Sequence, residues 1–139
     1  MHRTIMDTSF LFALMSKRDS NHAKCRAVVE SLRESPLLPV TVLPEVAYLI
    51  HTRIGHHAMR RFTGLLSEPI WDLVTPDQDD FARAAAVLET YASLALDFVD
   101  ATVVALAERL KVSTILTLDR RHFQPVRPRH APAFTLLPD

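Results

Sequence analysis

Short apolar segments alternate with longer amphipathic segments along this chain, and this alternation restricts the fold more than any other feature. The short segments are rich in β-branched and aliphatic residues, as buried strands are, and they cover residues 4–7, 37–40, 70–74, 113–118 and 133–138. The longer segments carry apolar residues three and four positions apart, as helices do, and they cover residues 8–16, 21–35, 42–54, 56–66, 79–95 and 96–110. Strands separated by helices favour an α/β fold with a mostly parallel sheet and helices on both faces.

Three residues refine this prediction around the second strand. Because proline cannot donate a hydrogen bond to a neighbouring strand, Pro39 predicts an irregular or edge position for the strand at 37–40. Thr41 is predicted to cap the helix that follows. Pro44 is compatible with that helix because it lies in the first turn, where its missing N–H is not needed.

The size and charge of the chain limit its function classes. Its 139 residues are enough for one proper core, so residues 1–139 are interpreted as a single domain. The 16 basic and 16 acidic residues leave no net charge, so contacts with nucleic acid must use local patches. The single cysteine, Cys25, excludes an intramolecular disulfide and a cysteine-rich zinc site. Its place on an apolar helical stripe predicts a buried structural thiol.

Several motifs are absent from the sequence. The two glycines, Gly55 and Gly64, do not follow a predicted strand, which excludes a glycine-rich phosphate loop and a dinucleotide fingerprint. The seven histidines form no H-E-x-x-H motif, which argues against a zinc hydrolase. Asp7 interrupts the first apolar run, unlike in a signal peptide, and the longest apolar runs are too short to cross a bilayer. The default expectation is a cytoplasmic protein that does not contact a membrane.

Acidic residues recur close to the ends of the predicted strands. Asp7 ends the first strand and Asp119 ends the strand at 113–118. Glu45 lies in the first turn of the helix after the second strand, and Asp100 lies at the start of a later helix that must pack against the same sheet. Because parallel α/β folds bind ligands at the carboxyl ends of their strands, these four acids are candidates to converge on one rim.

Each acid also has a purely structural interpretation. Asp7, with Ser9 as an equal alternative, can cap a helix; Glu45 can complement a positive helix end; and Asp119 can begin a turn. These interpretations weaken when the acids are taken together, because carboxylates about 4 Å apart repel by roughly 4 kcal/mol at an effective dielectric of about 20. A cation would remove the repulsion. Oxygen ligands with no nearby histidine or cysteine suit Mg²⁺ or Mn²⁺.

Four blocks of the sequence carry a resemblance to a known family. In order and spacing, "MDTSFLFAL", "LPEVAYLI", "DFVDATVVALAERL" and "ILTLDRRHF" resemble the motif blocks of PIN-domain proteins, and they look most like the VapC-type toxins of bacterial toxin–antitoxin pairs. The resemblance runs from Arg3 to the C-terminal "PAFTLLP". It implies a compact three-layer α/β/α domain that acts as a metal-dependent ribonuclease.

The resemblance also assigns roles to individual residues. The acidic cluster of the family maps onto Asp7, Glu45, Asp100 and Asp119, with Thr8 and Thr117 at the positions of two small polar residues. Asp7 and Asp100 would hold one or two Mg²⁺ or Mn²⁺ ions that activate water and bind the scissile oxygens. Glu45 and Asp119 would complete the shell or orient the attacking water. The implied reaction is in-line cleavage that leaves a 5′-phosphate and a 3′-hydroxyl.

An acidic pocket repels RNA, so neighbouring basic residues matter for binding. The candidates for phosphate contacts are Arg120 and Arg121, which directly follow an acid of the cluster, and Arg60 and Arg61 in "RIGHHAMRR". Further candidates in the same two stretches are Arg53, His56, His57 and His122. The alternative for Arg60 and Arg61 is that they only solvate a helix face.

The partners also follow from the resemblance. It implies an RNA substrate, a small cognate antitoxin that restrains the toxin, and a homodimer. The apolar helical stretches at 37–50 and 56–66 are compatible with a groove for a partner helix, although the same residues can belong to the core. The alternative to an enzyme is a PIN-like fold that has lost activity and persists as a partner-binding module.

Asp97 and Asp100 stand three residues apart at the start of an apolar helix. The motif of the family places its acid at Asp100, directly before Ala101 in "DATVVALA". Asp97 has no counterpart in the motif and suits the N-cap of the helix, which would put Asp100 in the first turn. We therefore predict that Asp100 is a metal ligand and that Asp97 is chiefly a helix cap.

Overall fold

Every strand of the central sheet is short and runs parallel to its neighbours in the computed structural model, which describes residues 3–139. The strands are β1 (Thr4–Met6), β2 (Leu37–Pro39), β3 (Asp72–Val74), β4 (Thr114–Leu116) and β5 (Thr135–Leu137). Their order across the sheet is β3-β2-β1-β4-β5. The predicted α/β fold with a mostly parallel sheet is confirmed, and each strand lies within a segment where the sequence predicts one.

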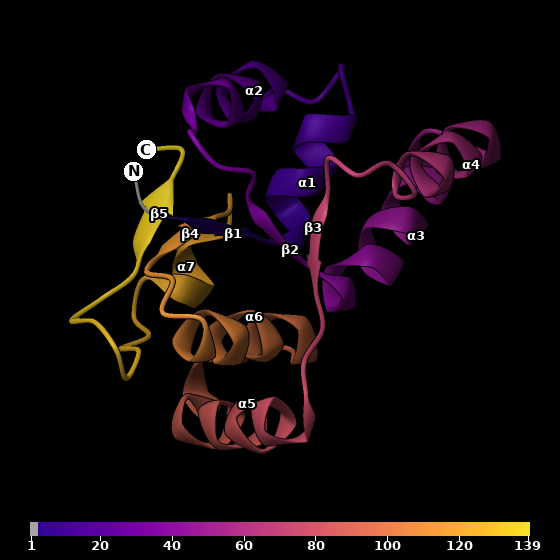
Figure 1. The fold of residues 1–139 in the computed structure, drawn as a ribbon. Coiled ribbons are helices and arrows are strands. Elements are labelled where there is room, and N and C mark those ends of the chain that lie inside the picture. The colour runs from indigo at the N-terminus through magenta and orange to yellow at the C-terminus, as the bar shows by residue number, and fades with distance from the viewer. Residues whose placement is uncertain (1–2) are drawn as a thin grey trace.

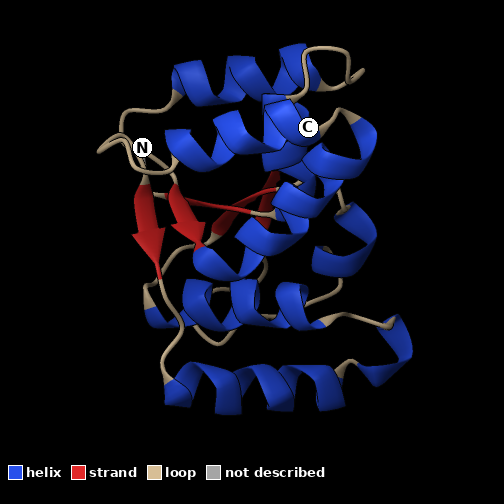
Figure 2. Cartoon of the chain, turned by 90° about the vertical axis from the view of Figure 1, so that its right-hand side faces the viewer, coloured by secondary structure: helices blue, strands red, loops and turns tan. Residues whose placement is uncertain are grey.

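Helices cover both faces of this sheet (Figure 1). The helices are α1 (Thr8–Met15), α2 (His22–Ser31), α3 (Leu43–Arg53), α4 (His56–Leu65), α5 (Gln78–Thr90), α6 (Phe98–Arg109) and α7 (Arg120–Phe123). Two short 3₁₀ turns precede α3 and α6, at Val40–Val42 and Ala92–Leu94. In Figure 1, α1 and α2 lie on one side of the strands and α6 on the other, with α5 beyond α6. Figure 2 shows the same layers from the side.

The core lies between the sheet and these helices. The middle strand, β1, is buried along its whole length, and Ile5 pairs with Leu37 of β2 and with Ile115 of β4. Helix α6 is buried continuously from Asp100 to Glu108 because it is packed between the sheet and α5. Burial on all sides explains why its sequence is apolar around most of its circumference.

The predictions around the second strand need two corrections. β2 is not an edge strand, because it lies between β1 and β3. Pro39 is tolerated because it is the last residue of β2 and leads directly into a 3₁₀ turn. Thr41 does not cap α3, because the N-cap of that helix is Val42. The hydroxyl of Thr41 instead lies 2.8 Å from the hydroxyl of Thr102 in α6. Pro44 lies in the first turn of α3 as predicted.

None of the helices between residues 3 and 139 is long and apolar enough to cross a membrane.

Candidate active site

Asp7 stands at the point where β1 ends and α1 begins. Its backbone occupies the N-cap position of α1, but its side chain makes no capping hydrogen bond. The carboxylate instead accepts hydrogen bonds from Thr117 Oγ1 at 2.8 Å and from Ser9 Oγ at 3.4 Å. The residue is only 3% exposed. A buried carboxylate held by two hydroxyls beside the end of β4 is not a simple helix cap.

The segment after β4 is fixed beside Asp7 by the same hydroxyls. Thr117 Oγ1 accepts a hydrogen bond from the backbone N–H of Asp119 at 2.9 Å, and Ser9 Oγ accepts one from the N–H of Leu118 at 2.9 Å. The N–H of Asp7 donates to the carbonyl of Leu116 at 2.9 Å. These bonds bring Asp7 and Asp119 to the same edge of the sheet although they are far apart in sequence.

Asp97 and Asp100 form a capping box at the start of α6. Asp97 Oδ1 accepts a hydrogen bond from the Asp100 N–H at 2.8 Å, and Asp100 Oδ2 accepts one from the Asp97 N–H at 3.1 Å. The predicted cap at Asp97 is therefore present. Asp100 takes part in the cap as well as in the acidic cluster, because one of its oxygens also faces the segment after β4.

His122 completes this cluster, and the expectation that no histidine lies nearby was wrong. Its Nδ1 lies 2.8 Å from Asp119 Oδ2 and 3.1 Å from Asp100 Oδ2. Ligand atoms of these three residues all lie within 4.8 Å of one another. The sequence contains a signal for this arrangement, because Asp119 and His122 are three residues apart and the short helix α7 places them on one face.

The four predicted acids line a single cleft of about 290 Å³. Asp7, Asp100 and Asp119 come from the carboxyl ends of the central strands and the start of α6, and Glu45 enters from the first turn of α3. The remaining lining residues are Thr8, Ser9, Phe12, Asp19, Leu49, Arg53, Asp97 and Leu118. Thr8 is buried there, and its Oγ1 has no hydrogen-bond partner among the described residues. Clustered carboxylates and an unpartnered hydroxyl fit the oxygen ligands of a divalent cation.

Burial and mutual repulsion disfavour the charged forms of two of these acids. Burial is the main cause that raises the pKa of Asp7 to about 6; the hydrogen bond from Thr117 opposes this rise, and the charges of Asp119 and Glu45 contribute to it. Burial likewise raises the pKa of Asp100 to about 7, with added repulsion from Asp97 and Asp7. A bound cation would reverse both effects because it stabilises the charged carboxylates.

These pKa shifts predict how the stability of the metal-free protein depends on pH. Above the ordinary value of 3.8, the folded state holds protons that the unfolded state has released. The free energy of unfolding should therefore fall as pH rises from about 4 to about 7, by about 1.4 kcal/mol for each unit of pKa shift. Chemical denaturation at several pH values in EDTA measures this fall. An Asp100→Asn variant should show a shallower fall, and an equally steep one would contradict the prediction.

The basic residues proposed for phosphate contacts are distributed differently from the acids. Among the arginines, Arg53 lines the cleft, with its guanidinium 5.4 Å from the centre of the Phe12 ring. Arg120 points to the C-terminal strand, where it donates to the carbonyls of Pro138 at 3.2 Å and Leu136 at 3.5 Å. Arg60 lies on α4 against two histidines of the same helix. Arg121 is exposed on α7.

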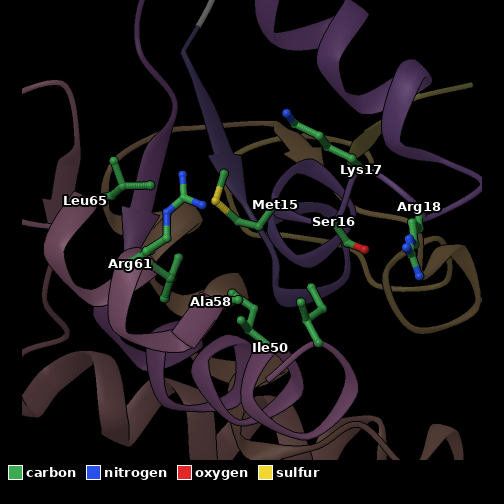
Figure 3. A pocket seen from close by; sticks show the side chains of 10 residues that line it. Met15, Ser16, Lys17, Arg18, Ile50, Ala58, Arg61 and Leu65 are labelled. Carbon is green, nitrogen blue, oxygen red and sulfur yellow. The ribbon is translucent and has the colours of Figure 1, made fainter. Parts of the chain in front are cut away.

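A second cavity of about 390 Å³ lies where the end of α1 meets α3 and α4. Its walls are mainly apolar. Ile50 comes from α3 and Ile54 is the C-cap of that helix, and Phe62 and Leu65 come from α4. Its basic residues are Lys17, Arg18 and Arg61, and Figure 3 shows their side chains around the opening. We call this cavity the α3–α4 groove. Arg61 therefore belongs to the groove and not to the acidic cleft.

Comparisons with known proteins agree with this architecture. The sequence pattern of the PIN domain matches residues 4–127. Ribonuclease VapC26 of Mycobacterium tuberculosis is 33% identical over 134 residues, which cover 96% of this chain and 99% of that protein. The match is therefore close to full length on both sides.

Solved structures show the same fold at lower identity. VapC20 of Mycobacterium tuberculosis, described as a sarcin–ricin loop cleaving toxin, superposes with a TM-score of 0.78 at 23% identity over 84% of this chain and 89% of that one. A toxin–antitoxin complex from Klebsiella pneumoniae gives a TM-score of 0.70 at 20% identity, with 88% and 92% covered. FitAcB from Neisseria gonorrhoeae gives 0.66 at 16% identity, with 86% and 90% covered. At these identities the likeness shows the fold alone.

Proposed function

Because the chain belongs to the PIN-domain family, we propose that it is a metal-dependent endoribonuclease that acts as the toxin of a bacterial toxin–antitoxin pair. The observation that carries the proposal is the convergence of Asp7, Glu45, Asp100 and Asp119 on one cleft. Carboxylates that share one cleft repel each other, and a cation between them removes this repulsion. The near full-length relative named as a ribonuclease supports RNA as the substrate.

The residues of the cleft have distinct tasks in this reaction. Asp7, Asp100 and Asp119 would hold Mg²⁺ or Mn²⁺, which when bound supplies activated water at neutral pH and charge neutralisation at the phosphate. Thr117 and Ser9 fix the Asp7 carboxylate by hydrogen bonds. Glu45 lines the same cleft from the first turn of α3, where its carboxylate can accept a proton from the attacking water. The proposed products carry a 5′-phosphate and a 3′-hydroxyl.

Arg53 is the residue best placed to bind the RNA backbone at the cleft. It lies two turns along α3 from Glu45, so both side chains lie on the side of the helix that lines the cleft. Packing against the Phe12 ring restricts its guanidinium, which lowers the entropy lost when it binds a phosphate. Arg121 offers a second contact from α7, because it is exposed close to Asp119.

The α3–α4 groove supports the second half of the proposal, a protein partner. An apolar groove between helices suits the apolar face of an amphipathic helix. The basic residues around it would attract a partner helix with acidic residues beside its apolar face. We propose that this helix belongs to the cognate antitoxin and that the toxin acts in the cytoplasm, where its RNA substrate lies. A homodimer is also part of the proposal, on the ground of family membership.

Inducible expression tests the biological role. We expect expression of this chain without an antitoxin to arrest bacterial growth, and sequencing of RNA 5′ ends after induction to show new ends at a limited set of sites. A chain that accumulates in soluble, folded form without either effect would contradict the toxin function. It would instead favour a catalytically silent partner-binding module.

A further inference from the structure

We propose that His122 is a direct ligand of the catalytic ion through its Nδ1 nitrogen. With Asp100 and Asp119, two of the three acids proposed above to hold the ion, it would form a mixed oxygen and nitrogen centre that prefers Mn²⁺ to Mg²⁺. This inference rests on the metal-dependent function proposed above, and it adds a ligand and an ion preference to that function.

The spacing of the three ligand atoms fits a single ion. His122 Nδ1 lies 2.8 Å from Asp119 Oδ2 and 3.1 Å from Asp100 Oδ2. In an octahedral shell with bonds of about 2.1 Å, adjacent ligand atoms lie about 3.0 Å apart. The two distances from His122 Nδ1 are therefore those expected of neighbours in one coordination shell, and ligand atoms of all three residues lie within 4.8 Å of one another.

Unsatisfied polar atoms at the site point to a missing partner. His122 Nδ1 is screened from solvent, and it makes no hydrogen bond of acceptable geometry with the carboxylates beside it. Thr8 Oγ1 on the cleft wall is also unpartnered, in a residue that is only 5% exposed. Buried polar atoms are nearly always paired, so one on the cleft wall and one beside two of the acids that line the cleft indicate a ligand there. A cation with its coordinated water satisfies both.

The fold holds His122 in place before any ion binds. Helix α7 starts directly after Asp119, and its Phe123 is fully buried. Arg120 ties the same turn to the backbone of the C-terminal strand through the carbonyls of Leu136 and Pro138. A ligand on such a fixed turn loses little entropy on binding a metal, and the imidazole need not move to reach the ion.

The ligand types decide the preferred ion. Mg²⁺ is a hard ion that takes oxygen ligands almost exclusively and keeps several waters. Imidazole nitrogen suits transition metals, and carboxylates suit Mn²⁺ as well as Mg²⁺. All three groups, the two carboxylates and the imidazole, therefore contribute to Mn²⁺ binding. The imidazole adds little to the binding of Mg²⁺.

Pulsed electron paramagnetic resonance of the Mn²⁺-loaded protein tests the ligand directly. The parent chain should show coupling of Mn²⁺ to a directly bound ¹⁴N nucleus, and His122→Asn should lose it. Asparagine keeps a polar side chain near the position of Nδ1 but removes the imidazole. His57→Asn on α4 is the matched control, because His57 is exposed outside the cleft and contacts Arg60 of the same helix. This variant should keep the coupling.

Calorimetric titration tests the ion preference. His122→Asn should weaken Mn²⁺ binding by at least about tenfold, the lower end of what even indirect metal contacts contribute, and should weaken Mg²⁺ binding much less. His122→Gln provides a second variant if His122→Asn fails to fold by circular dichroism. Equal losses for both ions would overturn the proposal, since His122 would then act only by positioning the carboxylates.

The two proposals fail in different ways. If Mn²⁺ binds and RNA is cleaved but the parent chain shows no directly bound ¹⁴N, only the role of His122 is wrong. If neither Mn²⁺ nor Mg²⁺ binds to the parent chain, the metal-dependent function fails and the role of His122 fails with it. In that case the metal titration of Asp100→Asn should match that of the parent chain, as expected when neither protein holds an ion.

Discussion

An Asp7→Asn variant is expected to fold like the parent chain and to cleave RNA at least about 10³-fold more slowly. A catalytic metal contributes several kcal/mol of transition-state stabilisation, and each 1.4 kcal/mol corresponds to a factor of about ten in rate. Asparagine still accepts the hydrogen bond from Thr117 Oγ1, so the contact between β1 and the segment after β4 survives. What is lost is the charge that holds the ion.

The measurement is a single-turnover cleavage assay on structured RNA with Mn²⁺ or Mg²⁺, with unfolding curves to confirm the fold. Asp79→Asn is the matched control, because Asp79 is exposed on α5 and belongs to neither the cleft nor the capping box of its helix. It should leave the rate unchanged. A folded Asp7→Asn protein that cleaves as fast as the parent would locate the activity elsewhere or in a contaminant.

Asp97→Asn and Asp100→Asn are expected to differ sharply although the two residues share one capping box. Asparagine caps a helix about as well as aspartate, so Asp97→Asn should keep the stability and most of the activity. Asp100→Asn should also fold, because its amide oxygen can still accept the hydrogen bond from the Asp97 N–H. It should lose cleavage by about 10²-fold or more, because the Oδ2 that faces His122 no longer carries charge.

Thermal melting with and without Mn²⁺ separates the two roles. The parent and Asp97→Asn should gain stability when Mn²⁺ is added, since an ion that binds only the folded state stabilises it. Asp100→Asn should gain little, and without metal it should melt no lower than the parent because one repulsive charge is gone. If Asp97→Asn loses the gain as completely as Asp100→Asn does, Asp97 belongs to the metal site.

The elements of the fold were predictable because each carries a strong local pattern. The start of α6 is the clearest case, since Asp97 and Asp100 have the spacing of a capping box and the helix behind them is apolar. The order of the strands was harder to predict. Nothing local to Pro39 shows that β3 will pair on the outer side of β2, and a proline at the last position of a strand costs an interior strand little.

The candidate site was predictable for the acids and less so for their neighbours. The four acids follow from the rule that parallel strands present their carboxyl ends at one rim, and they line one cleft as expected. His122 was predicted as a phosphate contact and not as a neighbour of the acids, because no helix was predicted after residue 118 that would place it on one face with Asp119. The role of Arg120 could not be predicted, because a long side chain can reach in many directions and here it binds the C-terminal strand.

The pairing of β1 with β4 has a consequence for the timing of activity during synthesis. Asp7 emerges from the ribosome long before Asp119 and His122, which reach it only when β4 has docked beside β1. Contacts between residues so far apart in sequence form late in folding, because the intervening chain must be ordered first. The cleft is therefore absent from nascent chains and from fragments that stop before β4. A ribosome that translates this protein faces an active nuclease only after β4 and α7 have emerged and folded against β1.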